Sequence, residues 1–158
     1  METERDRKIK AFEFLCGNRL GVISTISSLD YTPQGSLVYY VVDGKNIYFI
    51  TTQQSRKIHN LTSRNSISFT LFSEIPPLEL QIEGDTQFVT DQDKKTHISK
   101  IYLENANKNP DTINWPPILK LPNDEGFHFV KITISKFKFS DFTKSERSII
   151  EGTPKDWV

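Results

Sequence analysis

The sequence has little of what several common kinds of site would need. Of its 158 residues only Cys16 is a cysteine, so the chain forms no internal disulfide and no multi-cysteine metal site. Basic and acidic residues number 20 each, which leaves no overall charge to attract nucleic acid or an anionic membrane. No apolar run approaches the length that spans a bilayer, and the charged N-terminus does not resemble a signal peptide. We therefore expect a cytoplasmic protein with no nucleic-acid or membrane partner.

Familiar catalytic motifs are also missing from the sequence. It contains no GxGxxG, no phosphate loop ending in GK[ST] and no HExxH. The three histidines, His59, His97 and His128, are far apart, so surface or half-buried positions are favoured over a metal site. Cys16 lies on the apolar side of a predicted helix, which favours a core thiol over a nucleophile. If the protein performs chemistry, we expect a bound cofactor to supply it.

What is present predicts one domain over residues 1–158, mainly β with flanking helices. A leading helix over 1–18 follows a capping-box pattern at Thr3 and Asp6, and the pair Asp43-Gly44 indicates a hairpin. Alternating apolar residues predict strands at 20–28, 36–42, 46–51, 66–72, 78–89 and 127–139, the last without a break in alternation. Helices are expected from near Arg56 and over 92–105, a long loop over 107–126, and a tail over 143–158. Six strands joined mostly by short turns favour a closed or nearly closed antiparallel barrel.

One stretch, YFITTQQSRKIHNL at residues 48–61, places two cations where a helix begins. Arg56 and Lys57 fall in the first turn, and each costs a few tenths to ~1 kcal/mol beside the positive end of the helix dipole. A bound dianion would explain them, because helix N–H groups, a guanidinium fork and an ammonium all bind phosphate. Hydroxyls at Thr51, Thr52 and Ser55 would donate further hydrogen bonds. The alternative is that both side chains point to water.

The order of these elements resembles the FMN-binding split-barrel family, typified by pyridoxamine 5′-phosphate oxidase and general-stress-type flavoproteins. The resemblance runs from about residue 7 to 92, through RLGVISTISS, SLVYYVVDGKNIYFIT, QSRKIHNLTSRNSISFTLF and LELQIEGDTQFVTD. It implies a homodimer with flavin in a groove between subunits, the phosphate near residues 51–57 and the second strand along the ring. The candidate cofactor-binding residues are Ser36, Val38, Tyr39, Ile50, Thr51, Thr52, Ser55, Arg56, Lys57, Gln81 and Trp157.

The chain departs from the oxidase pattern at three places. Ser36 stands where the oxidases have an arginine, Gln81 is displaced along its strand, and Arg147-Ser148-Ile149 replaces an Arg-x-His pattern. Oxidation of vitamin B6 is therefore not expected. Two tryptophans have open roles: Trp157 either caps a flavin in the partner subunit or packs in its own core. Trp115-Pro116-Pro117 forms either a lid or an ordinary surface loop.

The resemblance favours an FMN-dependent oxidoreductase whose substrate and catalytic residues the sequence does not indicate. An alternative of another class is a non-catalytic carrier of the same fold, holding FMN, FAD, the deazaflavin F420 or haem. A haem site would need an axial histidine, and His128 is the one placed within the predicted sheet. A third possibility is a barrel that has lost its ligand and serves in assembly.

Overall fold

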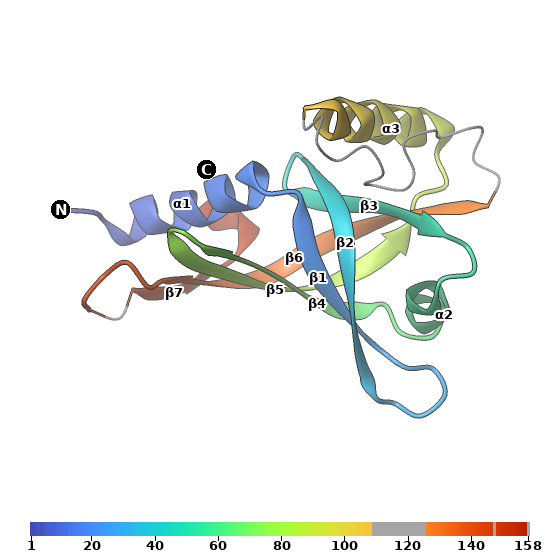
Figure 1. The fold of residues 1–158 in the computed structure, drawn as a ribbon, viewed down its shortest axis with the longest axis horizontal. Helices are drawn as coiled ribbons and strands as arrows, with labels where there is room; N and C mark the ends of the chain where they lie inside the picture. The colour runs from blue at the N-terminus through green and yellow to red at the C-terminus, as the bar shows by residue number, and fades with distance from the viewer. Residues whose placement is uncertain (109–125, 147, 158) are drawn as a thin grey trace.

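The computed structural model describes residues 1–108, 126–146 and 148–157. Its strands form one antiparallel sheet in the order β3-β2-β1-β4-β5-β6-β7, and pairing of β3 with β6 closes the first six into a barrel (Figure 1). The strands are β1 (Leu20–Ile26), β2 (Pro33–Asp43), β3 (Asn46–Thr52), β4 (Ser66–Glu74), β5 (Pro77–Phe88), β6 (Phe127–Asp141) and β7 (Ile149–Gly152). The predicted six-stranded antiparallel barrel is confirmed, and β7 is an addition to it.

Three α-helices accompany the barrel: α1 (Glu4–Gly17), α2 (Arg56–Ser63) and α3 (Gln92–Asn107). The predicted capping box opens α1, since Thr3 Oγ1 accepts from the Asp6 N–H at 3.1 Å and the Asp6 carboxylate accepts from the Thr3 N–H at 2.8 Å. Cys16, expected in the core, is exposed instead. Most of the predicted 107–126 loop, with Trp115-Pro116-Pro117, lies outside the described residues.

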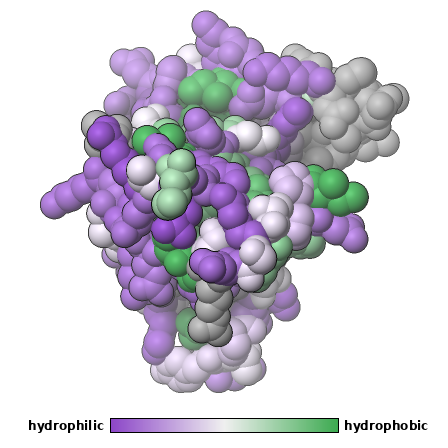
Figure 2. Space-filling model, turned by 90° about the vertical axis from the view of Figure 1, so that its left-hand side faces the viewer, coloured by the Kyte–Doolittle hydropathy of each residue, from purple (hydrophilic) through white to green (hydrophobic). Residues whose placement is uncertain are grey.

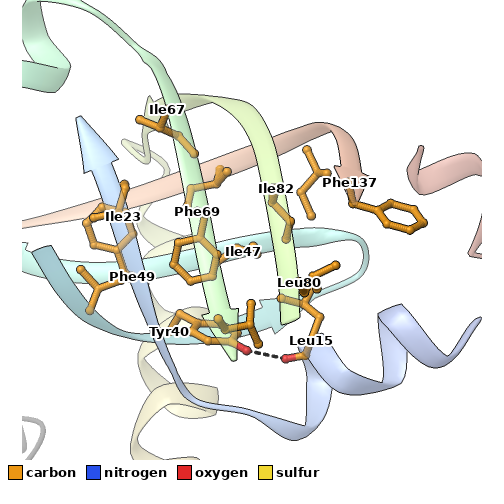
Figure 3. Packing of buried hydrophobic residues seen from close by; sticks show 14 of the residues in the cluster. Leu15, Ile23, Tyr40, Ile47, Phe49, Ile67, Phe69, Leu80, Ile82 and Phe137 are labelled. Carbon is orange, nitrogen blue, oxygen red and sulfur yellow. Dashed lines mark hydrogen bonds between the residues drawn. The ribbon is translucent and has the colours of Figure 1, made fainter. Parts of the chain in front are cut away.

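Inward-facing side chains of the six barrel strands make the main core, which Figure 3 shows from close by. Helix α1 adds Ala11 and Leu15 to this core, and α2 adds Ile58 and Leu61. The buried Oη of Tyr40 donates a 2.6 Å hydrogen bond to the Leu15 carbonyl oxygen, which ties β2 to the end of α1. The two helices lie on opposite sides of the barrel in Figure 1, and each is held by the apolar residues that it turns toward the core.

Helix α3 covers part of the barrel's outer surface and makes a second, smaller core. Its Ile98 and Tyr102 pack on outward-facing side chains of three strands, namely Tyr39, Val41, Tyr48, Ile50 and Phe129. Its first half is also held by charge, since Lys94 Nζ lies 2.5 Å from a carboxylate oxygen of Asp43, the last residue of β2. The outer faces of β2, β3 and β6 are therefore buried where α3 crosses them.

A bulge in β6 overturns the prediction that this strand alternates without a break. Glu83 pairs with Lys136 and Gly84 with Ile134, so Ser135 is an extra residue without a partner across the strand pair. The residues facing the core are Val130, Ile132 and Ile134 before the bulge, and Phe137 and Phe139 after it. The two faces of β6 thus exchange at Ser135.

Close backbone approach at the bulge explains a glycine in β5. A Cβ atom added to Gly84 would lie 2.4 Å from the carbonyl oxygen of Thr133, far inside a normal contact distance. The hydroxyl of Ser135 donates a 2.9 Å hydrogen bond to the Glu83 carbonyl oxygen and fastens the bulged residue. Glycine on one strand and serine on the other therefore make this irregularity possible.

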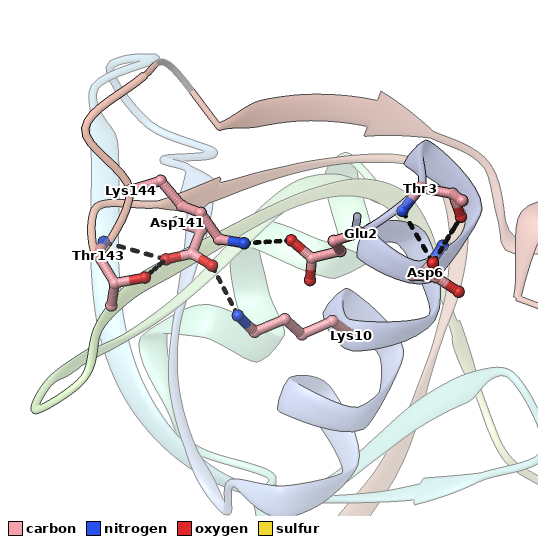
Figure 4. A network of polar contacts seen from close by, with 7 residues as sticks. All are labelled: Glu2, Thr3, Asp6, Lys10, Asp141, Thr143 and Lys144. Atoms are coloured by element: carbon pink, nitrogen blue, oxygen red, sulfur yellow. Dashed lines mark hydrogen bonds and ion pairs between the residues drawn. The ribbon is translucent and has the colours of Figure 1, made fainter.

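The C-terminal segment packs against α1 and the end of β6. Trp157 is 5% exposed, and its ring stacks between those of Phe12 and Phe137 at centroid distances of 5.0 and 4.8 Å. Nearby, the buried carboxylate of Asp141 accepts from Lys10 Nζ at 2.6 Å and from the Thr143 N–H at 3.0 Å (Figure 4). Figure 2 shows that the surface at this end is mostly hydrophilic, with separate apolar patches.

Candidate functional site

The start of α2 gathers hydroxyl and ammonium groups at the end of β3. The Oγ of Ser55 makes no capping bond to the helix and lies 3.3 Å from the Oγ1 of Thr51. The Nζ of Lys57 donates to the same Thr51 Oγ1 at 3.2 Å. The backbone N–H of Ser55 bonds the Thr52 carbonyl oxygen at 3.1 Å, which fixes the turn between strand and helix. The first N–H groups of α2, which no helical carbonyl can satisfy, are therefore left without a side-chain cap.

The two cations of this turn have no counter-ion in the part of the chain that the structure describes. Arg56 is exposed and Lys57 is half-buried, and no described carboxylate forms an ion pair with either. Burial lowers the pKa of Lys57, and the neighbouring Arg56 charge lowers it further. A half-buried, unpaired ammonium beside a second cation is unfavourable in the free protein, and a bound anion would relieve it. We call Thr51, Ser55, Arg56 and Lys57 the α2 cluster.

Beside the α2 cluster, β2 and β3 separate. They pair only from Tyr40 with Phe49 to Asp43 with Asn46, after which β2 continues along β1 and β3 continues along β6. Figure 1 shows the two strands diverging from their shared turn. Residues 36–39 and 50–52 therefore border the opening between the two strands without pairing across it, and we call this interval the β2–β3 split. Backbone N–H and C=O groups along it are potential partners for a planar ligand.

Most of the predicted site residues lie around this split or in the α2 cluster. Ser36 is partly exposed, and the side chain of Val38 belongs to the barrel core. The side chains of Tyr39 and Ile50 lie beneath α3, while Thr52 is exposed. Contacts of Val38, Tyr39 and Ile50 with a ligand would therefore come mainly from their backbone atoms.

Gln81 and Trp157 are not brought to the α2 cluster within this chain. Gln81 is half-buried in the middle of β5, and with Lys138 and Glu151 it lines a hollow of about 390 Å³ on the outer face of β5, β6 and β7. Trp157 lies in the core of its own chain, where its ring packs against Phe12 and Phe137. Of its two possible roles, the structure shows packing.

Two polar residues, His128 and Asn60, lie near the α2 cluster, and the sequence did not predict this. His128 is paired in register with Thr51, is half-buried, and its ring centroid lies 4.9 Å from that of Phe88. Asn60 is 2% exposed and bonds to β1 and β2. Its position inside a helix, where asparagine is a weak former, was the available signal. The described residues contain no group of three His, Cys, Asp or Glu side chains that could hold a metal ion.

Comparison with known proteins places this architecture in a family. The family model described as pyridoxamine 5′-phosphate oxidase matches residues 8–141. This chain belongs to the pyridoxamine 5′-phosphate oxidase family. Among curated proteins, none matches the sequence significantly. No helix in the described residues is both long and apolar enough to cross a membrane.

Several solved structures share its fold. Campylobacter jejuni ChuZ has a TM-score of 0.78 at 14% identity, over 99% of this chain and 63% of that one. A heme binding protein from Mycobacterium smegmatis has a TM-score of 0.73 at 11% identity, over 96% and 59%. General Stress Protein 26 from Bacillus anthracis str. Sterne has a TM-score of 0.62 at 19% identity, over 84% and 93%. This chain thus spans less than two thirds of the first two.

Proposed function

We propose that this protein binds FMN at the α2 cluster and the β2–β3 split, and that it is a cytoplasmic oxidoreductase using that flavin. The observation that carries the proposal is the half-buried Lys57 ammonium, held 3.2 Å from Thr51 Oγ1 with no described carboxylate paired to it. In a member of the pyridoxamine 5′-phosphate oxidase family, this arrangement suits a ligand's terminal phosphate.

Each group of the α2 cluster would have a distinct role toward the phosphate. The exposed Arg56 guanidinium would bind two oxygens as a fork, and Lys57 would supply a point charge. The hydroxyls of Thr51 and Ser55, now 3.3 Å apart, would donate to the remaining oxygens. The uncapped N–H groups of α2 would complete the site.

The flavin ring would lie along the β2–β3 split. Bound FMN supplies hydride or electron transfer, and the protein orients the ring and sets its electrostatic surroundings. Ser36 replaces the arginine that the oxidases carry at the start of this strand, so the α2 cluster provides the positive charge here. This difference argues for a substrate other than a vitamin B6 phosphate.

We further propose that the protein is a homodimer with the flavin at the subunit interface. Leu20, Val22 and Leu37 are each more than 40% exposed on the outer face of β1 and β2, where Val22 pairs directly with Leu37. A second copy covering this face would remove the three side chains from water. Sedimentation equilibrium tests this: we expect a dimer, and a monomer at micromolar concentration would contradict it.

The decisive experiment on ligand identity uses the purified protein. Mass spectrometry of any released ligand, followed by titration of ligand-free protein with FMN and visible spectroscopy, should give a flavin spectrum and saturable binding. Release of FAD or F420 would change the cofactor but retain the site. A colourless protein that fails to bind FMN would overturn the proposal, and Arg56→Ala should weaken binding by about 1.5–3 kcal/mol.

Haem is a second candidate because of His128. This half-buried imidazole lies opposite Thr51 in the β3–β6 pair, and a structural neighbour is described as a heme binding protein. A neutral imidazole on a rigid strand is a suitable axial ligand. A Soret band on addition of haemin, lost in His128→Ala, would favour haem over FMN.

A further inference from the structure

The side-chain amide of Asn60 links α2 to both strands of the β1–β2 hairpin. Its Nδ2 donates to Thr25 Oγ1 of β1 and to Gln34 Oε1 of β2, each at 2.9 Å. Its Oδ1 accepts from the Ser28 backbone N–H at 3.2 Å, in the turn between these strands. Asn60 and Thr25 are each 2% exposed, so the bond between them is shielded from water, while Gln34 is half-buried and Ser28 is exposed.

The chemistry of this position suits asparagine closely. A primary amide has two donors and one acceptor oxygen, and here both donors and the oxygen are used. A hydrophobic residue would leave the Ser28 N–H without this acceptor and remove a donor from Thr25 and Gln34. An unpaired polar group is costly at the buried Thr25 and less so at the more exposed Gln34 and Ser28, so the bond to Thr25 contributes most to the specificity of the linkage.

The elements that Asn60 joins are the two sides of the proposed ligand site. Asn60 lies on α2, whose first turn carries Arg56 and Lys57. Gln34 lies on β2, two residues before Ser36 at the start of the β2–β3 split. Because α2 is one continuous helix, fixing Asn60 relative to β2 also fixes the position of the α2 cluster relative to the split.

We infer that Asn60 is a positioning residue that sets the spacing between the phosphate-binding turn and the strand along the flavin ring. The inference rests on the proposed function and adds to it a basis for specificity. A phosphorylated flavin gains from both ends of the site only when their spacing matches the ligand. Asn60 therefore determines how strongly the protein prefers FMN over riboflavin, which has the same ring without the phosphate.

The experiment compares dissociation constants for FMN and riboflavin in the full-length protein. In Asn60→Ala the preference for FMN should fall about tenfold, because a charge-assisted phosphate contact is misplaced, while riboflavin affinity changes little. His59→Ala is the matched control, since this exposed neighbour on α2 is outside the linkage and should leave the preference unchanged. Thr25→Val and Gln34→Ala each remove one of the bonds that Asn60 makes and carry the test if Asn60→Ala does not fold.

A double-mutant cycle separates positioning from general stability. Once Lys57→Met has removed part of the phosphate contact, Asn60→Ala should reduce the FMN preference by less than it does alone. A lower melting temperature with an unchanged FMN-to-riboflavin ratio in the linkage variants would overturn the inference and leave the proposed function standing. A wild-type protein that fails to bind FMN would overturn the proposed function itself, and this inference with it.

Discussion

The ammonium of Lys57 donates a 3.2 Å hydrogen bond to the hydroxyl of Thr51, joining the first turn of α2 to the end of β3. This contact holds a cation where burial and Arg56 both disfavour its charge. Such an arrangement weakens the free protein and suits a bound anion, so stability and binding should respond in opposite directions when the ammonium is removed.

Lys57→Met should stabilise the ligand-free protein and weaken FMN binding. Removing the half-buried charge beside the helix start should raise the free energy of unfolding by a few tenths to ~1 kcal/mol. Loss of the phosphate contact should reduce FMN affinity by about 1.5–3 kcal/mol. Urea denaturation and FMN titration measure the two effects. Lys100→Met, at an exposed position on α3, is the control and should change neither; a less stable Lys57→Met would contradict the prediction.

The same side chain should make stability depend on pH in alkaline solution. The pKa of Lys57 in the folded protein lies below 10.5, so between the two values the unfolded chain binds more protons. The destabilisation due to Lys57 should therefore diminish as pH rises through the folded pKa toward 10.5. The difference in unfolding free energy between wild type and Lys57→Met should shrink over this range.

FMN binding should follow the opposite course in that range. The Lys57 ammonium loses its proton as pH rises through its lowered pKa, so its attraction for phosphate disappears. Titrations at several alkaline pH values should show wild-type affinity falling toward that of Lys57→Met. Parallel curves for the two proteins would contradict a role for the ammonium in binding.

Gly84→Ala should destabilise the protein by about 3 kcal/mol, since the added methyl group would force backbone movement at the β6 bulge. The Cβ position lies 2.4 Å from Thr133 O, and that oxygen belongs to a paired strand. Gly17→Ala is a matched control, because nothing lies within 4 Å of its Cβ position at the end of α1. There, alanine should be neutral or slightly stabilising. Thermal denaturation compares the two, and equal melting temperatures would contradict the steric argument.

Replacement of Trp157 should affect stability and not flavin affinity. Trp157→Ala removes a ring stacked between Phe12 and Phe137 and should cost about 3–5 kcal/mol. Trp157→Phe keeps part of the packing and should cost less, which allows FMN affinity to be measured in a folded variant. A marked loss of FMN affinity in Trp157→Phe would restore the possibility that this ring contacts the cofactor.

The barrel and the α2 cluster could be predicted from sequence because their signals are local. Period-two alternation marks strands, Asp43-Gly44 marks the hairpin, and Thr51 to Lys57 are close in the chain, so their convergence needs only one turn. The family resemblance, and not a local pattern, assigned residues of both β2 and β3 to one ligand. In the structure these residues lie where the two strands cease to pair.

What the sequence did not predict depends on contacts between distant segments. Strand β7 has four residues, and it forms by pairing with the edge of β6. The bulge at Ser135 requires Gly84 on another strand, and Asn60 is polar at a site buried only when α2 meets the β1–β2 hairpin. Local periodicity carries no information on such pairs.

The exchange of faces at Ser135 limits where the length of this chain can change. Loss of Ser135 alone would restore unbroken alternation in β6 and keep Phe137 and Phe139 facing the core. Loss or gain of any other single residue in β6 would turn one part of the strand to the wrong face, whereas added residues at a hairpin tip would leave every side-chain direction intact. Length changes compatible with the fold should therefore gather at the turns and, within β6, at Ser135 itself.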